Sequence, residues 1–191
     1  MIMQSPKVFI ISAPSGAGKS TLVRAMLARF DGFEFSISAT TRAPRAGEEE
    51  GVHYYFLTPE TFAARREAGD FLEWEEVYEG RFYGTLRSEV DRILARGQYP
   101  IFDVDVEGGL TIKQQYGAQA LSIFIQPPSL AVLRERLVKR GADSAEEIER
   151  RYRKAEQELA YAPQFDHVVV NDQLEEAIET LCALVGGHLQ R

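Results

Sequence analysis

The sequence has a single cysteine, Cys182, among 191 residues. One thiol cannot form a disulfide within the chain, which excludes a disulfide-stabilised secreted fold and fits a reducing compartment. Its neighbours Leu181, Ala183 and Leu184 are typical of an apolar helix face. We therefore expect a buried thiol that packs in the core and does not act as a nucleophile.

Long apolar runs are also missing. The first residues, MIMQSPKVFIIS, contain only a short apolar stretch, too short for a signal-peptide core or a membrane-spanning helix. We therefore expect a cytoplasmic protein without membrane contacts. There is no internal repeat and no low-complexity tail, and a chain of this length suits one domain with inserted subdomains.

Basic residues are in the minority, with 22 Lys and Arg against 29 Asp and Glu and a formal net charge of −7. A groove for DNA or RNA normally needs a basic surface, so we expect no nucleic-acid partner. The basic residues are nevertheless clustered, and a cluster can serve a small anion. No motif indicates the oligomeric state.

Apolar, β-branched runs predict four buried strands, at residues 7–12, 99–105, 120–126 and 167–171. A helix is expected to start near Gly18, and further helices lie between or after the strands, the last at about 174–189. Strands that alternate with helices indicate an α/β fold with a mainly parallel sheet.

Residues 34–85 interrupt this alternation. They contain the short strand-like runs EFSIS, HYYFL and FLEWEEVY and one helix, for which Thr58 is a cap and Pro59 the first residue. This pattern predicts a small insertion with a mixed β-sheet.

Residues 128–160 form a second interruption, made of two helical segments. Ser144 and Glu147 form a capping box before the second segment. Most of its basic side chains other than Arg151 (Arg150, Arg153 and Lys154) are expected to be surface charges, paired with Glu146, Glu147, Glu149 or Glu156. The remaining core then comprises residues 1–33, 86–127 and 161–191.

The stretch APSGAGKS, residues 13–20, follows a predicted strand and opens a predicted helix, which is the context of a Walker A phosphate loop. Gly16 and Gly18 allow backbone N–H groups to point inward and form an anion cradle. Lys19 can reach the β- and γ-phosphates, and the Ser20 hydroxyl can bind Mg²⁺. The strict pattern has glycine where this chain has Ala13, which has fewer backbone conformations.

A phosphate loop also predicts an acidic residue at the end of a neighbouring strand. The stretch IFDVDVEGG contains Asp103 directly after the apolar run, which suits a Walker B carboxylate that holds Mg²⁺ directly or through water. The alternative is a carboxylate that only caps the strand.

Nucleoside triphosphate handling leaves motor, GTPase and kinase activities open, and the insertion distinguishes among them. Arg42 and Arg45 offer bidentate donors for a phosphate, and the hydroxyls of Tyr54 and Tyr83 can add to them. Four such donors indicate an acceptor with its own phosphate. The glutamates at 48–50 are expected to form a solvated loop tip.

In order along the chain, SAPSGAGKST, SATTRAPRAGEEEGVHYYF, FLEWEEVYEGRFYGT and IFDVDVEGG resemble the guanylate kinase family. The resemblance runs from about residue 7 to about residue 185, and TTRAPRAGE at this position is its most specific part. It implies a P-loop nucleoside triphosphate hydrolase-type core with a GMP-binding insertion at 34–85 and a helical lid at 128–160. It also implies Mg²⁺ and the reaction ATP + GMP → ADP + GDP, with dGMP as a further acceptor.

The resemblance also assigns residues to the two nucleotides. For GMP they are Arg42, Arg45, Tyr54 and Tyr83 on the phosphate, Ser38, Glu73 and Thr85 on the base, and Asp105 beside the nucleotide. For ATP they are Ala13, Pro14, Ser15, Gly16, Ala17, Gly18, Lys19, Ser20 and Thr21 on the phosphates, with Asn171 and Asp172 at the adenine end. The catalytic set is Lys19, Asp103 and three lid arginines, Arg136, Arg140 and Arg151.

Glu73 has a clear chemical reason to read guanine, because one carboxylate can accept both the N1–H and the N2 amino group. Adenine has neither donor there and would leave a desolvated carboxylate unpaired, a difference that can reach about 10⁴ in favourable cases. Strand alternation puts Glu73 and Glu75 on the face opposite Leu72 and Trp74.

Two alternatives remain. A guanylate kinase-like scaffold without catalysis is disfavoured because Lys19, Ser20 and Asp103 are all present. A kinase of another phosphorylated acceptor, such as a ribose bisphosphate or a different nucleoside monophosphate, is disfavoured by Glu73 together with Ser38.

Overall fold

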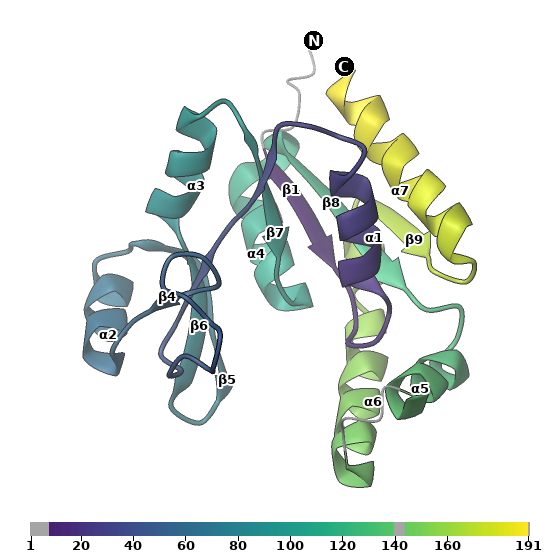
Figure 1. The fold of residues 1–191 in the computed structure, drawn as a ribbon, viewed down its shortest axis with the longest axis horizontal. Coiled ribbons are helices and arrows are strands. Elements are labelled where there is room, and N and C mark those ends of the chain that lie inside the picture. Colours follow the sequence, from purple (N-terminus) through teal and green to yellow (C-terminus); the bar gives the residue numbers. More distant parts are fainter. Residues whose placement is uncertain (1–7, 140–143, 191) are drawn as a thin grey trace. The chain divides into compact units, whose positions relative to one another are not determined.

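The computed structural model describes residues 8–139 and 144–190 (Figure 1). The chain divides into two compact units, one formed by residues 1–31 and 103–191 and the other by residues 32–102. The strands are described below sheet by sheet.

The predicted parallel sheet is confirmed. Its strands follow the order β2-β7-β1-β8-β9, and the pairs β1–β8, β8–β9 and β2–β7 are parallel. Each predicted strand agrees with an observed strand to within two residues at either end. The bounds are Val8–Ser12 for β1, Phe33–Phe35 for β2, Tyr99–Asp103 for β7, Ala120–Gln126 for β8 and His167–Val170 for β9.

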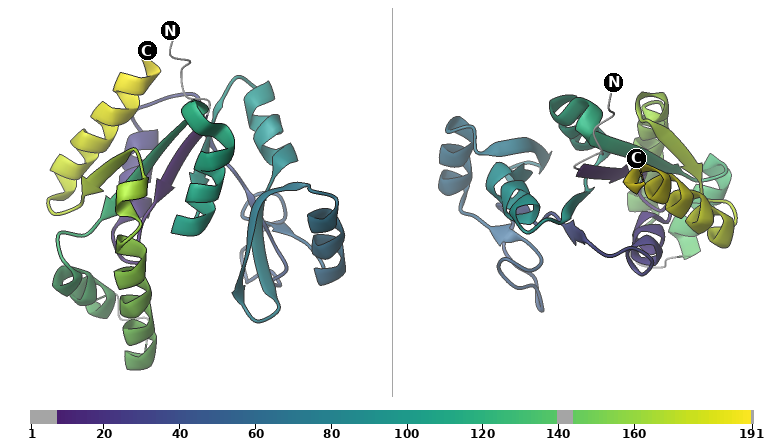
Figure 2. Two further views of the ribbon diagram at one scale, coloured as in Figure 1. Left: turned by 180° about the vertical axis from the view of Figure 1, so that it is seen from behind. Right: turned by 90° about the horizontal axis from the view of Figure 1, so that it is seen from above.

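Helices cover both faces of the first unit's strands (Figures 1 and 2). On one face α1 (Lys19–Leu27) lies beside α7 (Leu174–Leu189), and α4 (Val106–Tyr116) lies on the other. Leu22 and Met26 of α1 are fully buried, and burying each contributes about 1.5–3 kcal/mol to folding. Cys182 of α7 is buried, as its neighbours predict.

The second unit contains the predicted mixed sheet, with strand order β4-β3-β6-β5. Strand β3 is parallel to β4 and antiparallel to β6, and β5 and β6 form an antiparallel hairpin. Helix α2, which Thr58 caps as predicted, covers one face through an apolar cluster of Ala39, Phe62, Phe71 and Leu86. The bounds are Ser38–Thr40 for β3, Tyr55–Phe56 for β4, Pro59–Glu67 for α2, Phe71–Tyr78 for β5, Arg81–Leu86 for β6 and Arg87–Ala95 for α3.

The expectation of one strand at EFSIS is wrong, because the backbone changes partners within it. The Ser36 N–H donates to the Ile101 carbonyl at 2.9 Å, which continues the pairing of β2 with β7. The next N–H, of Ile37, donates to the buried Glu89 carboxylate at 3.1 Å. The chain then enters β3, so the segment supplies strands to two different sheets.

Helices α5 (Leu130–Lys139) and α6 (Ala145–Leu159) pack through Leu133, Leu137 and Ala155. Ser144 caps α6 by accepting a hydrogen bond from the Glu147 N–H at 3.3 Å, as the capping box predicts. The expected surface pairing is confirmed for two arginines of α6, in the pairs Arg150–Glu147 and Arg153–Glu149.

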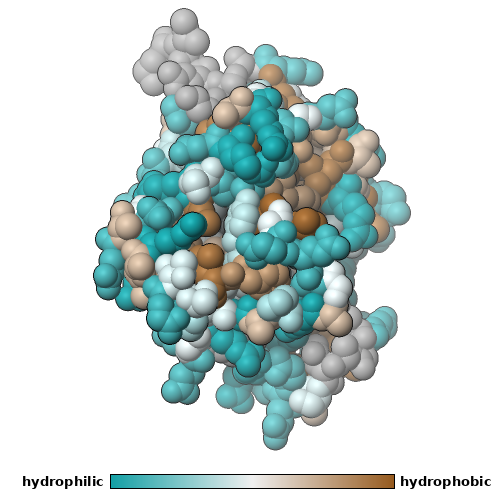
Figure 3. Space-filling view, turned by 60° about the vertical axis from the view of Figure 1, so that its left-hand side comes forward, coloured by the Kyte–Doolittle hydropathy of each residue, from teal (hydrophilic) through white to brown (hydrophobic). Residues whose placement is uncertain are grey.

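Among the described residues, no helix combines the length and the apolar character needed to cross a membrane. Hydrophilic residues also cover most of the face drawn in Figure 3, where apolar residues are limited to areas between them.

Candidate active site

The loop between β1 and α1 has the backbone of an anion cradle. Gly16 and Gly18 have φ angles of 90° and 93°, a region that glycine adopts without strain. A Cβ on Gly18 would also collide with the side-chain amide nitrogen of Asn171. That nitrogen donates to the Ala17 carbonyl at 2.7 Å, and Asn171 is buried. Asn171 therefore fixes the backbone of the loop from the protein interior.

Ala13 does not disturb this loop. No residue other than glycine has a positive φ in the part of the chain that the structure describes. Position 13 therefore does not need the conformational freedom of the glycine in the strict motif, and Ala13 packs as a buried side chain.

The loop opens into a cavity of about 590 Å³ in the first unit. Lys19 and Asp103 lie on its wall and form an ion pair. The Lys19 ammonium also donates to the Val104 carbonyl at 3.3 Å, and the two side chains are 18% and 46% exposed. Of the loop residues expected to bind ATP, those on the wall are Ala13, Pro14, Ser15, Gly16, Gly18, Lys19, Ser20 and Thr21.

Asp105 also lies on the cavity wall, and one of its carboxylate oxygens is already used. It caps α4 by accepting the Gly108 N–H at 2.8 Å. The Ser12 hydroxyl donates to the Asp105 backbone carbonyl at 3.1 Å, which fixes this turn to the end of β1.

Side chains of α5 and α6 reach the same cavity. Arg151 donates to the Ser15 hydroxyl at 3.4 Å. Arg136 lies on the wall and donates to the Asn171 carbonyl at 2.9 Å. Asp172 is exposed after β9, and Arg140 lies outside the described residues.

Sequence reasoning missed two charged residues of this wall, Lys154 and Glu158. The pairing partner expected for Lys154 was another glutamate of α6, whereas the structure pairs it with Glu158 at 3.8 Å. Burial raises the pKa of the Glu158 carboxyl. Their spacing of four residues on one helix is the signal that could have connected them.

The donor set fits Mg²⁺ bound together with a nucleotide. The Ser20 hydroxyl and the Asp103 carboxylate are hard oxygen donors on the cavity wall beside the cradle. Within residues 8–139 and 144–190, no three His, Cys, Asp or Glu side chains are grouped as a metal cage. Few protein ligands suit Mg²⁺, which takes most of its oxygens from water and phosphates.

In the second unit, Ser38, Glu73 and Thr85 form one row across the sheet. Thr85 pairs with Ser38 of β3 on one side and with Glu73 of β5 on the other. Directly paired residues project to the same face, and the Thr85 hydroxyl donates to the Glu73 carboxylate at 2.6 Å. The expected opposite side of β5 holds Trp74, which is 45% exposed beneath the Arg66 guanidinium.

The residues expected to bind the acceptor phosphate lie around Tyr83, two residues before Thr85 in β6. Arg42 Nε donates to the Tyr83 hydroxyl at 3.2 Å, and the Arg42 guanidinium carbon lies 5.3 Å from the centre of the Tyr54 ring. The rings of Tyr54 and Tyr83 are 6.0 Å apart and meet edge to face. Arg45 follows in the same loop and is exposed.

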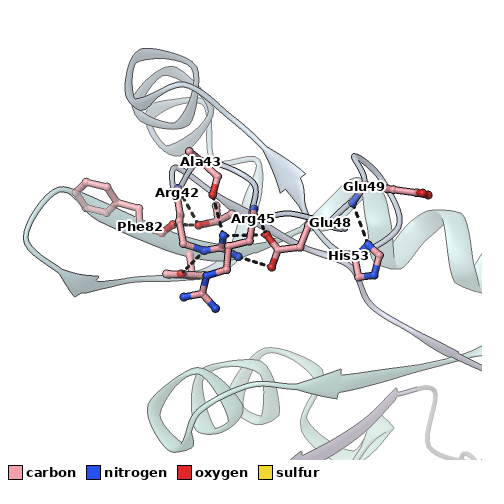
Figure 4. Close-up of polar contacts among 9 residues, drawn as sticks. Arg42, Ala43, Arg45, Glu48, Glu49, His53 and Phe82 are labelled. Carbon is pink, nitrogen blue, oxygen red and sulfur yellow. Dashed lines mark hydrogen bonds and ion pairs between the residues drawn. The ribbon is translucent and has the colours of Figure 1, made fainter. Parts of the chain in front are cut away.

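The expectation of a solvated glutamate tip is wrong for Glu48 (Figure 4). Its carboxylate pairs with both terminal nitrogens of Arg42 at 2.8 Å, and it accepts the Arg45 backbone N–H at 2.7 Å. The hydrogen bonds from Arg42 lower the pKa of Glu48 to about 2. Glu50 is also engaged, since it accepts the Phe56 N–H at 2.7 Å, whereas the Glu49 side chain extends outward.

Comparisons with known proteins point in one direction. A family model described as guanylate kinase matches residues 5–186. The guanylate kinase of Bacteroides fragilis is 56% identical over 171 residues, 90% of this chain and 84% of that protein. That of Porphyromonas gingivalis is 54% identical over 176 residues, 92% of this chain and 94% of that protein.

A solved structure agrees with the sequences. The crystal structure of guanylate kinase from Anaplasma phagocytophilum matches with a TM-score of 0.73 and 28% identity, covering all of this chain and 90% of that chain. With the family model spanning nearly the whole sequence and relatives more than half identical over most of it, the chain belongs to the guanylate kinase family.

Proposed function

We propose that this chain transfers the γ-phosphoryl group of ATP to GMP and so produces ADP and GDP. The observation that carries the proposal is the row of Ser38, Thr85 and Glu73 on one face of the second unit's sheet. Successive residues on the same strand face are about 7 Å apart, so Tyr83 with Arg42 lies one such step from the base row. Residues that recognise guanine therefore lie beside residues that can bind a phosphate, an arrangement that suits guanosine monophosphate.

ATP is the proposed ligand of the cradle in the first unit. Backbone N–H groups of the loop and the Lys19 ammonium bind its phosphates, and Asn171 keeps the loop in shape from behind. Phosphoryl transfer relies mainly on positioning and electrostatics. Arg136 and Arg151 add positive charge beside the loop, and Arg140 is assigned to the same task by the family pattern.

Mg²⁺ would be held by Ser20 and Asp103, and when bound it supplies positive charge that offsets the charge on the phosphate oxygens. Asp105 is assigned to the GMP side, and Asn171 and Asp172 to the adenine end. We also propose that residues 34–85 serve GMP binding and that residues 128–160 act as the lid. We also propose a cytoplasmic location, which the single cysteine supports because it fits a reducing compartment.

The test is a coupled assay of ADP release with GMP, dGMP, AMP, UMP and ribose 1,5-bisphosphate as acceptors. GMP is expected to be the best acceptor and dGMP the next. Neither the residues assigned to the base nor those assigned to the acceptor phosphate need the 2′-hydroxyl. If AMP or the sugar phosphate matched GMP, the assignment of the acceptor would fail.

A further inference from the structure

Glu48 connects the two arginines assigned to the acceptor phosphate (Figure 4). Its Oε1 accepts from Arg42 Nη2 and its Oε2 from Arg42 Nη1, both at 2.8 Å. Oε2 also accepts the backbone N–H of Arg45 at 2.7 Å. One carboxylate therefore fixes a side chain and a backbone three residues apart.

Arg42 is largely committed to this internal network. Besides the two bonds to Glu48, its Nε donates to the Tyr83 hydroxyl and its Nη1 to the Ala43 carbonyl at 2.8 Å. A guanidinium has five N–H donors, so these four bonds leave a single N–H on Nη2. The Arg42 side chain is only 9% exposed and that of Glu48 18%. Arg42 thus has little rotational freedom and a largely compensated charge.

Arg45 is the opposite case. Its guanidinium forms no hydrogen bond or ion pair with any residue in the described ranges, and in Figure 4 it extends away from Glu48. Only its backbone is held. Arg45 therefore supplies an exposed cation on a fixed backbone, close enough to Glu48 for the two charges to attract each other. Arg42 supplies a fixed donor.

We propose that Glu48 is a positioning residue for the phosphate of GMP. It holds the Arg42 guanidinium against Tyr83 and fixes the backbone from which Arg45 extends, so both donors are preorganised before the nucleotide arrives. Preorganisation increases affinity because less freedom is lost on binding. This inference rests on the proposed role of Arg42 and Arg45 in binding the acceptor phosphate.

The test compares Glu48→Gln with the matched control Glu49→Gln. The glutamine keeps the size of the side chain but loses its charge and turns an amide N–H₂ toward Arg42 donors. Initial rates give KM and kcat for GMP, and competition against GMP gives the inhibition constant of guanosine, which has the base but no phosphate. Because charge-assisted hydrogen bonds are lost, KM for GMP should rise roughly tenfold in Glu48→Gln. The guanosine inhibition constant and KM for ATP should stay unchanged, and Glu49→Gln should match the wild type.

Three results would overturn the proposal. An unchanged KM for GMP would mean that Glu48 positions nothing. A lower KM would mean that it competes with the phosphate for Arg42. Equal weakening of GMP and guanosine would reveal a general structural role.

The variant Arg45→Ala tests separately whether the loop binds the acceptor phosphate at all, the proposal on which the role of Glu48 rests. If Arg45→Ala raises KM for GMP and Glu48→Gln does not, only the role of Glu48 is lost. If Arg45→Ala leaves KM for GMP unchanged, the assignment of these residues to the acceptor phosphate is wrong, and so is the proposed role of Glu48.

Discussion

The Thr85 hydroxyl donates a hydrogen bond to the Glu73 carboxylate at 2.6 Å across adjacent antiparallel strands. The bond holds one carboxylate oxygen of Glu73, Oε1, in a defined place beside Thr85, the middle residue of the row formed by Ser38, Thr85 and Glu73. Because Thr85 is buried at 1% exposure, its hydroxyl has a fixed environment, and Glu73 is oriented before any base is bound.

Glu73→Gln should weaken GMP binding and relax the choice of base. An amide oxygen can accept only part of what the carboxylate accepts, and its N–H₂ faces the donors of guanine. Losing a hydrogen bond to a charged group costs about 1.5–3 kcal/mol, so KM for GMP should rise about 10- to 100-fold. Initial rates with GMP and with AMP check this. An unchanged ratio of the two rates would mean that Glu73 does not recognise the base.

Gly84→Ala should damage the same row from the backbone. A Cβ at Gly84 would lie 2.7 Å from the Glu73 carbonyl oxygen and 2.9 Å from the Trp74 Cβ, so β5 would have to move. Such overpacking costs about 1–3 kcal/mol. We expect a lower urea midpoint and a raised KM for GMP, with KM for ATP unaffected.

Gly187→Ala is the matched control for this substitution. Gly187 lies in α7, and nothing is within 4 Å of the position its Cβ would take. Alanine in an open helical position favours folding by roughly 0.5–1 kcal/mol relative to glycine. If both variants behaved alike, the close approach at Gly84 would not be what positions Glu73.

The sequence predicted those parts of the structure that are determined by residues adjacent in the chain. The apolar runs at 120–126 and 167–171 became β8 and β9, and the loop with Gly16 and Gly18 has the expected positive φ angles. These features depend on neighbours in the chain, so a short stretch of sequence contains their cause.

The pairings between distant or irregular segments were not predictable in this way. The change of strand partners within EFSIS depends on Glu89, more than fifty residues later in the chain. No local sequence pattern indicates it. Glu48 reads as one of three equivalent glutamates, but only the folded loop brings its carboxylate to Arg42. Lys154 reads as a surface charge and no local pattern singles out Glu158, because most of the cavity that they line is formed by other elements.

Lys19→Ala should mainly reduce turnover. The ammonium of Lys19 lies on the wall of the cradle, where it pairs with Asp103. Removing one well-placed electrostatic donor typically costs about 10²–10³ in kcat. Single-turnover and steady-state rates with ATP and GMP measure this loss, and GMP binding by calorimetry serves as the internal control. A variant with normal kcat would contradict the assignment of the loop.

Glu89→Ala should destabilise the second unit, although Glu89 itself is not assigned to either nucleotide. The Glu89 carboxylate is buried and accepts from the Ile37 N–H, the Tyr55 hydroxyl at 2.8 Å and the Arg92 guanidinium. Removing it leaves these donors without their acceptor, and breaking a buried pair costs roughly 3 kcal/mol. Urea unfolding at pH 7 should show this loss, whereas Asp91→Ala, on the exposed side of the same helix, should leave the midpoint unchanged.

The same variant predicts a definite pH dependence. Burial tends to raise the pKa of Glu89, but the hydrogen bonds from Arg92, Ile37 and Tyr55 outweigh it and lower that pKa below its ordinary value. A carboxyl with a lowered folded-state pKa stabilises the fold above the unfolded-state pKa and loses this contribution as the pH falls through the folded-state value. The difference in unfolding free energy between the wild type and Glu89→Ala should therefore be constant near neutral pH and shrink in acid below about pH 4.5. A difference independent of pH would mean that packing of the side chain, and not its charge, holds β2, β3 and α3 together.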